Sequence, residues 1–427
     1  MVRGGLSVEG FLRYVPSINT PWHLFVESLP PGSGFPHPLT ARNAEIGLIE
    51  PLEPPSLEEV QRARARIADV AVRTPLVRLP LDAPTDALGS PPVELYLKLE
   101  SLQPIGSFKL RGALNAIRAM PPERLRDGVY TTSAGNMAQG LAWAAREIGV
   151  PCRIVAPDHI PRTKADAIVR LGATVRTVPF AEWWAGLTAH HVAGERGVFV
   201  HPGADRAVMA GNGTIGLEIL EDLPEVDAVL VPYGSGGLAC GIAAAVRTAT
   251  LSRPVYAVEL DGRAPYAAAL AAGTPVTIPY AANFVDSMGG TSVLAEMWPL
   301  ARASLAGSLS ATLAQVADAI RLLVDRVHVV AEGAGAAPVA AALANNLNNL
   351  GRTRHVVCVV SGGNIDAPSA SSCQTSAGSA GVTLIWPFLS EWQSGSVLST
   401  AKFISGKGAT LPVAVAVQPN ASVTVSG

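Results

Sequence analysis

Short apolar segments alternate with helix-like segments along most of this chain, and this alternation restricts the fold more than any other feature. The strand-like segments are residues 93–99, 152–156, 174–178, 227–232, 255–259 and 356–360. Several of them are followed by a glycine-containing turn and an alanine-rich stretch. Apolar strands that alternate with helices are typical of parallel sheets covered on both faces. The sequence therefore predicts an α/β fold whose parallel-dominated sheets are flanked by helices.

Regular structure is expected to begin at Ser56. Residues 1–55 are rich in Pro and Gly and show no sustained period, so we expect an irregular N-terminal extension. Ser56 and Glu59 have the spacing of a capping box and predict the first helix. Another helix is predicted over residues 162–171. Gly172 follows this periodic stretch and would end the helix.

The last part of the chain has a different character. Residues 367–427 are rich in Ser and Ala, contain few charged residues and lack the strand–helix alternation, although residues 411–417 could pair as a strand. This atypical tail is interpreted either as a disordered extension or as the result of an altered reading frame, and both interpretations stay open.

The composition argues against several classes of protein. The chain has 427 residues, of which 48% are apolar and 15% are charged, with a net charge of −2. This length predicts one or two domains, and the lack of a basic stripe argues against a nucleic-acid partner. Apolar stretches are interrupted before they reach about 18 residues, so no transmembrane helix and no membrane partner are expected.

The cysteines form no recognisable framework. They are Cys152, Cys240, Cys358 and Cys373. No CxxC pair is present, so buried free thiols are expected rather than disulfides or a zinc site. The N-terminus also lacks a basic region followed by an apolar run, as in a signal peptide. Both features favour a reducing compartment, and we expect the cytoplasm.

A lysine opens a predicted helix in the segment 98–113, KLESLQPIGSFKLRGA. The helix dipole disfavours a cation at this end, and apolar neighbours add to the effect, so both would lower the pKa of Lys109. A lysine with a lowered pKa can act as a nucleophile that forms a Schiff base. A solvated surface lysine is the alternative interpretation.

Three glycine- or serine-rich turns follow predicted strands and could hold anions. Residues 132–140, TSAGNMAQG, offer backbone N–H groups for a carboxylate, although an ordinary N-cap turn is as good an interpretation. Residues 232–238, PYGSGGL, suit a single phosphate, because they lack the Lys-Ser/Thr pair of a nucleotide loop and the later Gly of a dinucleotide fingerprint. Residues 361–364, SGGN, present Ser361 at the carboxyl edge of a sheet, or form a plain β-turn.

Together these segments resemble the threonine/serine dehydratase branch of the fold-type II pyridoxal 5′-phosphate (PLP) enzymes. The resemblance covers about residues 56–366, in motif order and spacing, and extends to residues 201–220 and 331–343. It implies a two-domain fold, with each domain built on a parallel-dominated sheet flanked by helices. The large PLP-binding domain would comprise residues 56–127 and 206–366, and a small substrate domain, residues 128–205, would be inserted in it.

The resemblance also implies roles for individual residues. Lys109 would form the Schiff base with the cofactor, and Phe108 would pack near the cofactor ring. Asn136 would bond the 3′-oxygen of the ring, and Ser361 would face its pyridine nitrogen. The cofactor phosphate would be bound by backbone N–H groups of Gly234, Ser235, Gly236, Gly237 and Leu238. The substrate carboxylate would be held by Ser133, Ala134, Gly135, Asn136 and Gln139.

The implied reaction is an elimination. Lys109 would take the α-proton as general base, the β-hydroxyl would leave after protonation by the cofactor phosphate or a nearby acid, and a 2-keto acid and ammonia would form. A neutral Ser361 beside the ring nitrogen would suit elimination better than transamination. The implied activity is a lyase acting on L-threonine or L-serine, and the implied assembly is a homodimer. Another fold-type II reaction, such as β-replacement, and an inactive cofactor-binding relative stay open.

The chain departs from the family pattern at a few positions. Met137 replaces the histidine of SAGNHAQG, and Ser235 replaces a glycine of the phosphate loop. Ala134 stands where related racemases carry a serine, which favours a dehydratase. Glu259 matches one metal ligand of the racemases, but Arg263 lies where further ligands would be, so no metal site is expected. An ion pair between Glu259 and Arg263 is the structural alternative.

Overall fold

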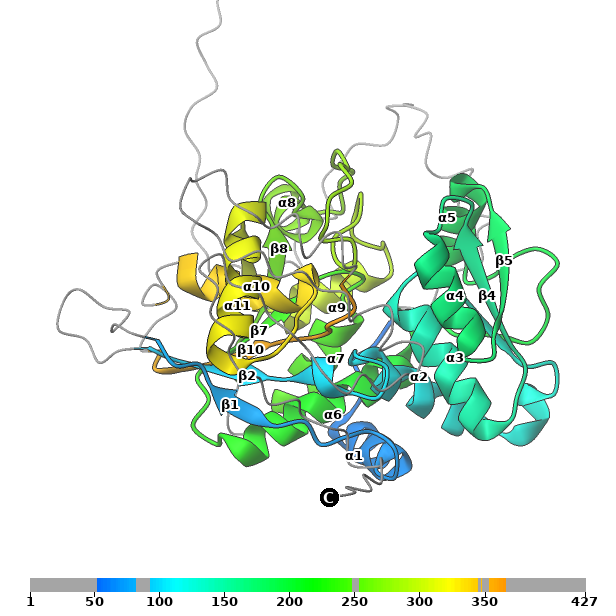
Figure 1. The fold of residues 1–427 in the computed structure, drawn as a ribbon, viewed down its shortest axis with the longest axis horizontal. Coiled ribbons are helices and arrows are strands. Elements are labelled where there is room, and N and C mark those ends of the chain that lie inside the picture. Colours follow the sequence, from blue (N-terminus) through cyan, green and yellow to red (C-terminus); the bar gives the residue numbers. More distant parts are fainter. Residues whose placement is uncertain (1–51, 82–92, 248–252, 345–346, 348–352, 366–427) are drawn as a thin grey trace, which may run out of the picture. The chain divides into compact units, whose positions relative to one another are not determined.

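The computed structural model describes residues 52–81, 93–247, 253–344, 347 and 353–365 (Figure 1). Most of the expected N-terminal extension and the whole tail 367–427, with its possible strand at 411–417 and Cys373, lie outside these residues. The described strands form a six-stranded sheet in the order β1-β2-β10-β7-β8-β9 and a four-stranded sheet in the order β5-β4-β3-β6. All strand pairs described are parallel except β1–β2, so the expectation of parallel-dominated sheets is confirmed.

The strands of the six-stranded sheet come from both ends of the described chain. They are β1 (Leu76–Arg78), β2 (Glu94–Lys98), β7 (Ala228–Pro232), β8 (Val255–Leu260), β9 (Gly307–Ala311) and β10 (His355–Val359). The helices that accompany them are α1 (Leu57–Ile67), α2 (Lys109–Arg118), α6 (Arg206–Asp222), α7 (Gly237–Val246), α8 (Pro265–Ala272), α9 (Met297–Ser304), α10 (Leu313–Val327) and α11 (Gly333–Ala344).

The four-stranded sheet is built from one continuous stretch of chain. Its elements are β3 (Val129–Thr132), α3 (Asn136–Ile148), β4 (Cys152–Pro157), α4 (Arg162–Arg170), β5 (Thr174–Val178), α5 (Phe180–Ala189) and β6 (Val198–Phe199). Short 3₁₀ helices, η1 (Glu100–Leu102) and η2 (Pro122–Leu125), lie on either side of α2. Helix α2 packs against both α3 and α6 and so connects the two sheets.

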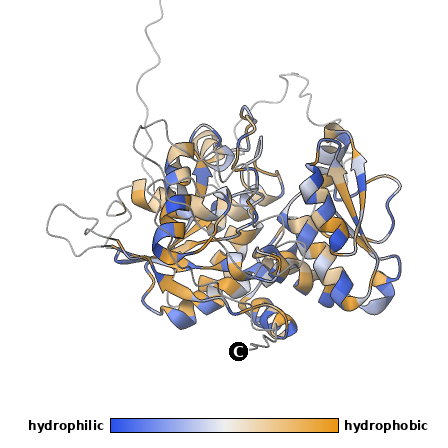
Figure 2. Cartoon of the chain, viewed as in Figure 1, coloured by the Kyte–Doolittle hydropathy of each residue, from blue (hydrophilic) through white to orange (hydrophobic). Residues whose placement is uncertain are grey.

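Both faces of the central strands of the six-stranded sheet are buried, which explains why β7 and β10 consist mostly of apolar residues. Along β10, Val356 and Cys358 contact the apolar cluster that includes residues of α10 and α11, whereas Val357 and Val359 contact the cluster of α7 and α9. Alternate residues of a strand point to opposite faces, so a strand covered on both sides needs apolar residues throughout. Figure 2 shows hydrophobic residues along these strands and polar residues on the outer side of helices such as α1.

Local signals in the sequence set several element boundaries. Ser56 and Glu59 form the predicted capping box before α1, with the Glu59 amide donating to Ser56 Oγ at 3.2 Å. Gly172 has a φ of +94° between α4 and β5, a conformation that glycine adopts at little cost. Cys152, Cys240 and Cys358 are buried free thiols, as expected. Among the described residues, no helix has the length and apolar character needed to cross a membrane.

A buried network of charged groups fixes α2 to its neighbours. The guanidinium of Arg111, in the first turn of α2, donates to Glu100 at 2.8 Å and to Glu218 of α6 at 2.7 Å. Lys98 of β2 lies 2.6 Å from the same Glu218 carboxylate. All four side chains are buried, and each charge has a partner of opposite sign. Removing one member would leave buried charges without a partner, so the network holds the start of α2 in place.

Candidate active site

Lys109 is the first residue of α2, as the sequence predicts, and the chain just before it is attached to the end of β10. The amide of Phe108 donates to the carbonyl of Ser361 at 3.0 Å, and Ser107 forms a β-bridge with Gly362. The Nζ atom of Lys109 donates to the carbonyl of Pro202 at 2.6 Å and lies 5.1 Å from the centre of the Phe108 ring. Phe108 itself is buried.

The pKa of Lys109 is lowered from its ordinary value to about 8. Burial of the ammonium group is the main cause, and the nearby Glu332 carboxylate opposes it by raising the pKa. A lowered pKa of Lys109 is also what the sequence predicts from its apolar neighbours. An amine with a pKa of about 8 is neutral in a substantial fraction of molecules near neutral pH, so it is available as a nucleophile or base.

The start of α3 lies against the start of α2. A Cβ atom at Gly140 would lie 3.1 Å from the carbonyl carbon of Lys109, so this glycine permits the close approach of the two helices. Helix α3 begins at Asn136, and no described side chain caps its first turn. The free N–H groups of that turn and the half-buried residues before it are therefore a candidate anion-binding site beside the lysine. The predicted substrate-binding residues found there are Ser133, Ala134, Gly135, Asn136 and Gln139.

The start of α7 is a second uncapped helix terminus near Lys109. It follows β7, and no described side chain bonds to its first N–H groups. Gly236 has a φ of +90°, and a Cβ at Gly237 would lie only 2.5 Å from the carbonyl oxygen of Gly203. Pro202, which accepts the bond from Lys109, precedes Gly203, so this loop connects the lysine to the α7 terminus. The predicted phosphate-binding residues found there are Gly234, Ser235, Gly236, Gly237 and Leu238.

Two asparagines and a glutamate join the start of α3 to the loops of the large sheet. The Asn136 Nδ2 donates to Glu332 Oε1 at 2.8 Å, and its Oδ1 accepts from Asn364 Nδ2 at 2.8 Å. The backbone amide of Glu332 donates to the carbonyl of Gly362, in the loop that also contacts Ser107. Ser361, the predicted partner of the cofactor nitrogen, is buried directly after β10.

Glu332 is a site residue to which the sequence interpretation gave no role. It lies immediately before α11, and its carboxyl is buried. Burial raises its pKa to about 7, against the lowering effect of the Asn136 and Ser287 hydrogen bonds. The available signal was that Glu332 is the single charged residue in the apolar segment 329–344.

Met137 occupies the core rather than the site. Its side chain is buried in the apolar cluster that includes Leu114 and Ile117 of α2 and Leu141 of α3. The replacement of the expected histidine therefore adds apolar packing under α3. It does not remove a member of the polar group around Lys109.

These residues fit a phosphorylated aldehyde cofactor. The α7 terminus offers unbonded N–H groups suited to one phosphate, and Lys109 offers an amine whose pKa is lowered to about 8. Asn136 adds a side-chain amide at the first residue of α3. The turn before α7, PYGSGGL, lacks the later glycine of a dinucleotide fingerprint, so it suits a single phosphate better than a pyrophosphate.

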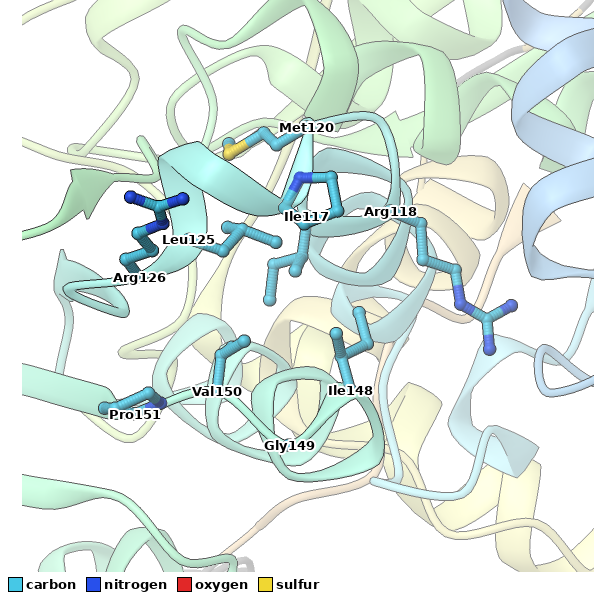
Figure 3. Close-up of a pocket in the computed structure, with 10 residues that line it drawn as sticks. Ile117, Arg118, Met120, Leu125, Arg126, Ile148, Gly149, Val150 and Pro151 are labelled. Atoms are coloured by element: carbon cyan, nitrogen blue, oxygen red, sulfur yellow. The ribbon is translucent and has the colours of Figure 1, made fainter.

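A separate cavity lies away from this site (Figure 3). It has a volume of about 540 Å³ and lies between the end of α2, η2 and the end of α3. Its lining is mainly apolar, and Figure 3 shows the Arg118 side chain directed away from it, where it pairs with Asp69. The described residues that line it include no lysine, serine or carboxylate, so this cavity offers no nucleophile and no carboxyl acid.

The described residues give no support for a metal at the position used by racemases. Glu259 accepts bonds from the amides of Tyr266 and Ala267 at the start of α8 and from the Ser308 hydroxyl at 2.7 Å. Arg263 donates to the carbonyl of Met288 instead, so the expected alternative of a Glu259–Arg263 ion pair is wrong. The amides at the helix start compete for the carboxylate because they carry the positive end of the dipole.

A different group, His190, His201 and Glu296, has ligand atoms within 4.8 Å of one another. However, His201 Nδ1 accepts from the amides of Gly203 at 3.0 Å and Ala204 at 2.6 Å. The ring hydrogen of a neutral His201 must therefore lie on Nε2, which leaves neither nitrogen a lone pair for a metal. His190 Nε2 pairs with Glu296 Oε1 at 2.8 Å. The group is better described as a contact between α5 and the start of α9.

The chain is similar to known pyridoxal-phosphate dependent enzymes. Residues 67–362 match the family model described as pyridoxal-phosphate dependent enzyme. The chain is 40% identical to an L-threonine ammonia-lyase of Geobacter sulfurreducens over 291 residues, which cover 67% of this chain and 70% of that protein.

Solved structures are also similar. The processed form of threonine deaminase isoform 2 from Solanum lycopersicum has a TM-score of 0.64 at 28% identity, with 76% of this chain and 95% of that chain covered. The serine racemase of Dictyostelium discoideum has a TM-score of 0.65 at 29% identity, with 73% and 99% covered. The family match covers most of the described residues, and this chain belongs to the fold-type II pyridoxal-phosphate dependent enzymes.

Proposed function

We propose that this protein is a PLP-dependent ammonia-lyase that converts L-threonine, L-serine or both to a 2-keto acid and ammonia. The observation that carries the proposal is Lys109, whose amine has a pKa of about 8 and lies between two uncapped helix starts. The similarity to L-threonine ammonia-lyases supports the same reaction class. Ala134, in place of the serine of related racemases, favours elimination over racemisation.

The cofactor would be held by groups already in position. The N–H groups of Gly234 to Leu238 would bind its phosphate, and Phe108 would pack near its ring. Asn136 would donate to the ring oxygen, and Ser361 would face the ring nitrogen. When bound, PLP condenses with an amine and withdraws electrons from the α-carbon, which makes the α-proton acidic.

The protein side of the reaction then needs a positioned substrate and a base. The turn from Ser133 to Gln139 would hold the substrate carboxylate through N–H groups at the start of α3. The Nζ atom of Lys109 would take the α-proton, which its lowered pKa allows near neutral pH. The buried surroundings of this amine exclude water and so protect the reacting groups.

The organisation of the chain around this site is part of the proposal. Residues 56–127 and 206–366 would form the cofactor domain, and residues 128–205 the inserted substrate domain. A homodimer follows from the family resemblance. A cytoplasmic location is supported by the buried free thiols, which suit a reducing compartment.

Product analysis tests this function. Purified protein supplied with PLP is incubated with L-threonine and L-serine, and 2-oxobutanoate, pyruvate and ammonia are measured. We expect equal amounts of keto acid and ammonia. Adding a thiol as a competing nucleophile should leave the products unchanged, whereas a thioether product would show β-replacement and contradict the lyase assignment.

A further inference from the structure

The proposed elimination needs an acid as well as a base. Hydroxide is a poor leaving group, so the β-hydroxyl must receive a proton as its bond to carbon breaks. Lys109 cannot supply this proton at the same moment, because it is taking the α-proton. Resting on the proposed function, we infer that Glu332 is the general acid that protonates the departing β-hydroxyl.

Glu332 is held in a fixed relation to Lys109. The backbone amide of Glu332 donates to the carbonyl of Gly362 at 2.9 Å. The backbone amide of Phe108, the residue before Lys109, donates to the carbonyl of Ser361 at 3.0 Å. The acid and the base are thus both attached, through their own backbones, to consecutive residues of one loop. Their charges also interact, since the Glu332 carboxylate raises the pKa of Lys109.

The hydrogen-bond network assigns the proton of a neutral Glu332 to one oxygen. Asn364 Nδ2 donates both to the carbonyl of Ile105 at 2.9 Å and to Asn136 Oδ1 at 2.8 Å. The amide of Asn136 is therefore oriented with its Nδ2 towards Glu332 Oε1, at 2.8 Å. Because Oε1 accepts this bond, the carboxyl proton lies on Oε2, where it can be donated.

The same carboxyl is able to hold a proton near neutral pH. Burial raises the pKa of Glu332 to about 7, and the negative charge of Asp286 adds to this effect. Asn136, Ser287 and Lys164 lower the pKa but do not outweigh burial. A carboxyl with a pKa near the working pH is well suited to donate and regain a proton in each cycle.

A route for regaining the proton leads to the surface. Ser287 bonds to Glu332 and lies 3.2 Å from Asp286 Oδ1. Asp286 is 52% exposed and pairs with Lys164, and both border a cavity of about 80 Å³ that Glu332 also lines. The polar lining and size of this cavity suit at least one water molecule. Ser287 and Asp286 therefore supply a path between Glu332 and solvent.

The step balances in atoms and charge. The Cα–H bond breaks, and its electron pair becomes the second bond between the α- and β-carbons. The bond between the β-carbon and its oxygen breaks, and that electron pair stays on the oxygen. That oxygen takes the proton from Glu332 Oε2 and leaves as water, while Lys109 Nζ holds the α-proton. Glu332 is left as a carboxylate and regains a proton from solvent along the Ser287–Asp286 path.

Two substrates with different leaving groups test this role. Chloride leaves without a proton, so Glu332→Gln should lower the activity with β-chloro-L-alanine far less than the activity with L-serine or L-threonine. The same variant should lose about 10²–10⁴-fold in kcat for L-serine or L-threonine. Glu259→Gln is the matched control, since Glu259 is also a buried carboxyl but caps α8, and it should leave the ratio of the two activities unchanged.

Two readouts do not depend on turnover. The visible absorbance of bound PLP should be the same in Glu332→Gln as in wild type. The infrared difference spectrum of the two proteins should contain the C=O band of a protonated carboxyl, which fades as the pH rises through about 7. Absence of this band below pH 7 would overturn the inference.

The outcomes separate the inference from the proposed function. If wild type releases keto acid from L-serine and Glu332→Gln lowers both activities equally, Glu332 has another role and the acid lies elsewhere. A wild-type protein that eliminates chloride but acts on neither hydroxy-amino acid would overturn the proposed function, and the role of Glu332 with it.

Discussion

Lys109 Nζ donates a 2.6 Å hydrogen bond to the carbonyl oxygen of Pro202, in the loop that packs against the start of α7. This contact places the reactive amine beside the turn proposed to bind the cofactor phosphate, although the two segments are 93 residues apart. The amine must leave this carbonyl to condense with an aldehyde. Binding of the cofactor and the protonation state of Lys109 are therefore linked.

The first prediction concerns the pH dependence of cofactor uptake. Below pH 8 Lys109 is mostly an ammonium ion and cannot attack an aldehyde, whereas above its pKa of about 8 it is neutral. The rate at which cofactor-free protein gains PLP absorbance should rise about tenfold per pH unit and level off above pH 8. Stopped-flow absorbance measures this rate. A plateau reached only near the ordinary pKa of lysine would show that burial does not lower the pKa of Lys109.

The second prediction concerns Glu332 and stability. Its folded-state pKa is raised from 4.5 to about 7, so the unfolded chain loses this proton first as the pH rises. The stability that the neutral carboxyl provides is complete below pH 4.5 and is lost as the pH rises through about 7. Glu332→Gln should therefore unfold with a free energy about 1–3 kcal/mol higher than wild type at pH 8, and show no such gain near pH 4.5. Urea titrations of the cofactor-free proteins measure both values, and an equal difference at the two pH values would contradict the raised pKa.

The third prediction concerns the close contact at Gly237. A methyl group there would lie 2.5 Å from the Gly203 carbonyl, which is too close for any side chain, so the loop and the start of α7 must separate. Gly237→Ala should weaken PLP binding by about tenfold or more, because a shift in the N–H groups loses hydrogen bonds to the phosphate. Gly290→Ala is the control, since its Cβ would meet only one atom, at 3.7 Å. Equal PLP affinities in fluorescence titrations of the two variants would argue against a phosphate site at this turn.

The fourth prediction compares two arginines of α2. Arg111 is buried between Glu100 and Glu218, and Arg111→Met should lower the free energy of unfolding by about 3–5 kcal/mol, because buried carboxylates lose their partner. Arg118 pairs with the exposed Asp69, so Arg118→Met should cost about 1 kcal/mol or less. Denaturant unfolding of both variants measures the difference. Similar losses would mean that the buried network does not stabilise α2.

Much of the fold could be predicted from local patterns, because the spacing of apolar residues along the chain reflects which side chains are buried. The segment 174–178 is β5, and the helix beginning at Lys109 is α2. Strand β9, over Gly307–Ala311, was not predicted, because its sequence GSLSA is neither apolar nor regularly alternating. It lies at the edge of the sheet and is half-buried, so its pairing to β8 depends on backbone hydrogen bonds more than on its side chains.

The site was predictable only in part, because some of its contacts join residues that are far apart in the chain. Lys109 and the glycine-rich turns carry local signals, since a helix start and a close backbone approach restrict the residue type. The partners of Asn136 could not be predicted, because Asn364 and Glu332 lie 228 and 196 residues further along the chain and meet it only in the folded protein. The direction of Met137 into the core likewise depends on how α3 packs on α2.

The most direct test of the account is the release of 2-keto acid from L-threonine and L-serine by wild type and by Lys109→Ala, each supplied with PLP. The account predicts that wild type releases keto acid and ammonia in equal amounts, and that the variant loses at least about 10²–10⁴-fold in rate while remaining folded. Keto acid release at the wild-type rate by Lys109→Ala would contradict the role of this lysine. No release by a folded, PLP-loaded wild type would contradict the lyase function itself.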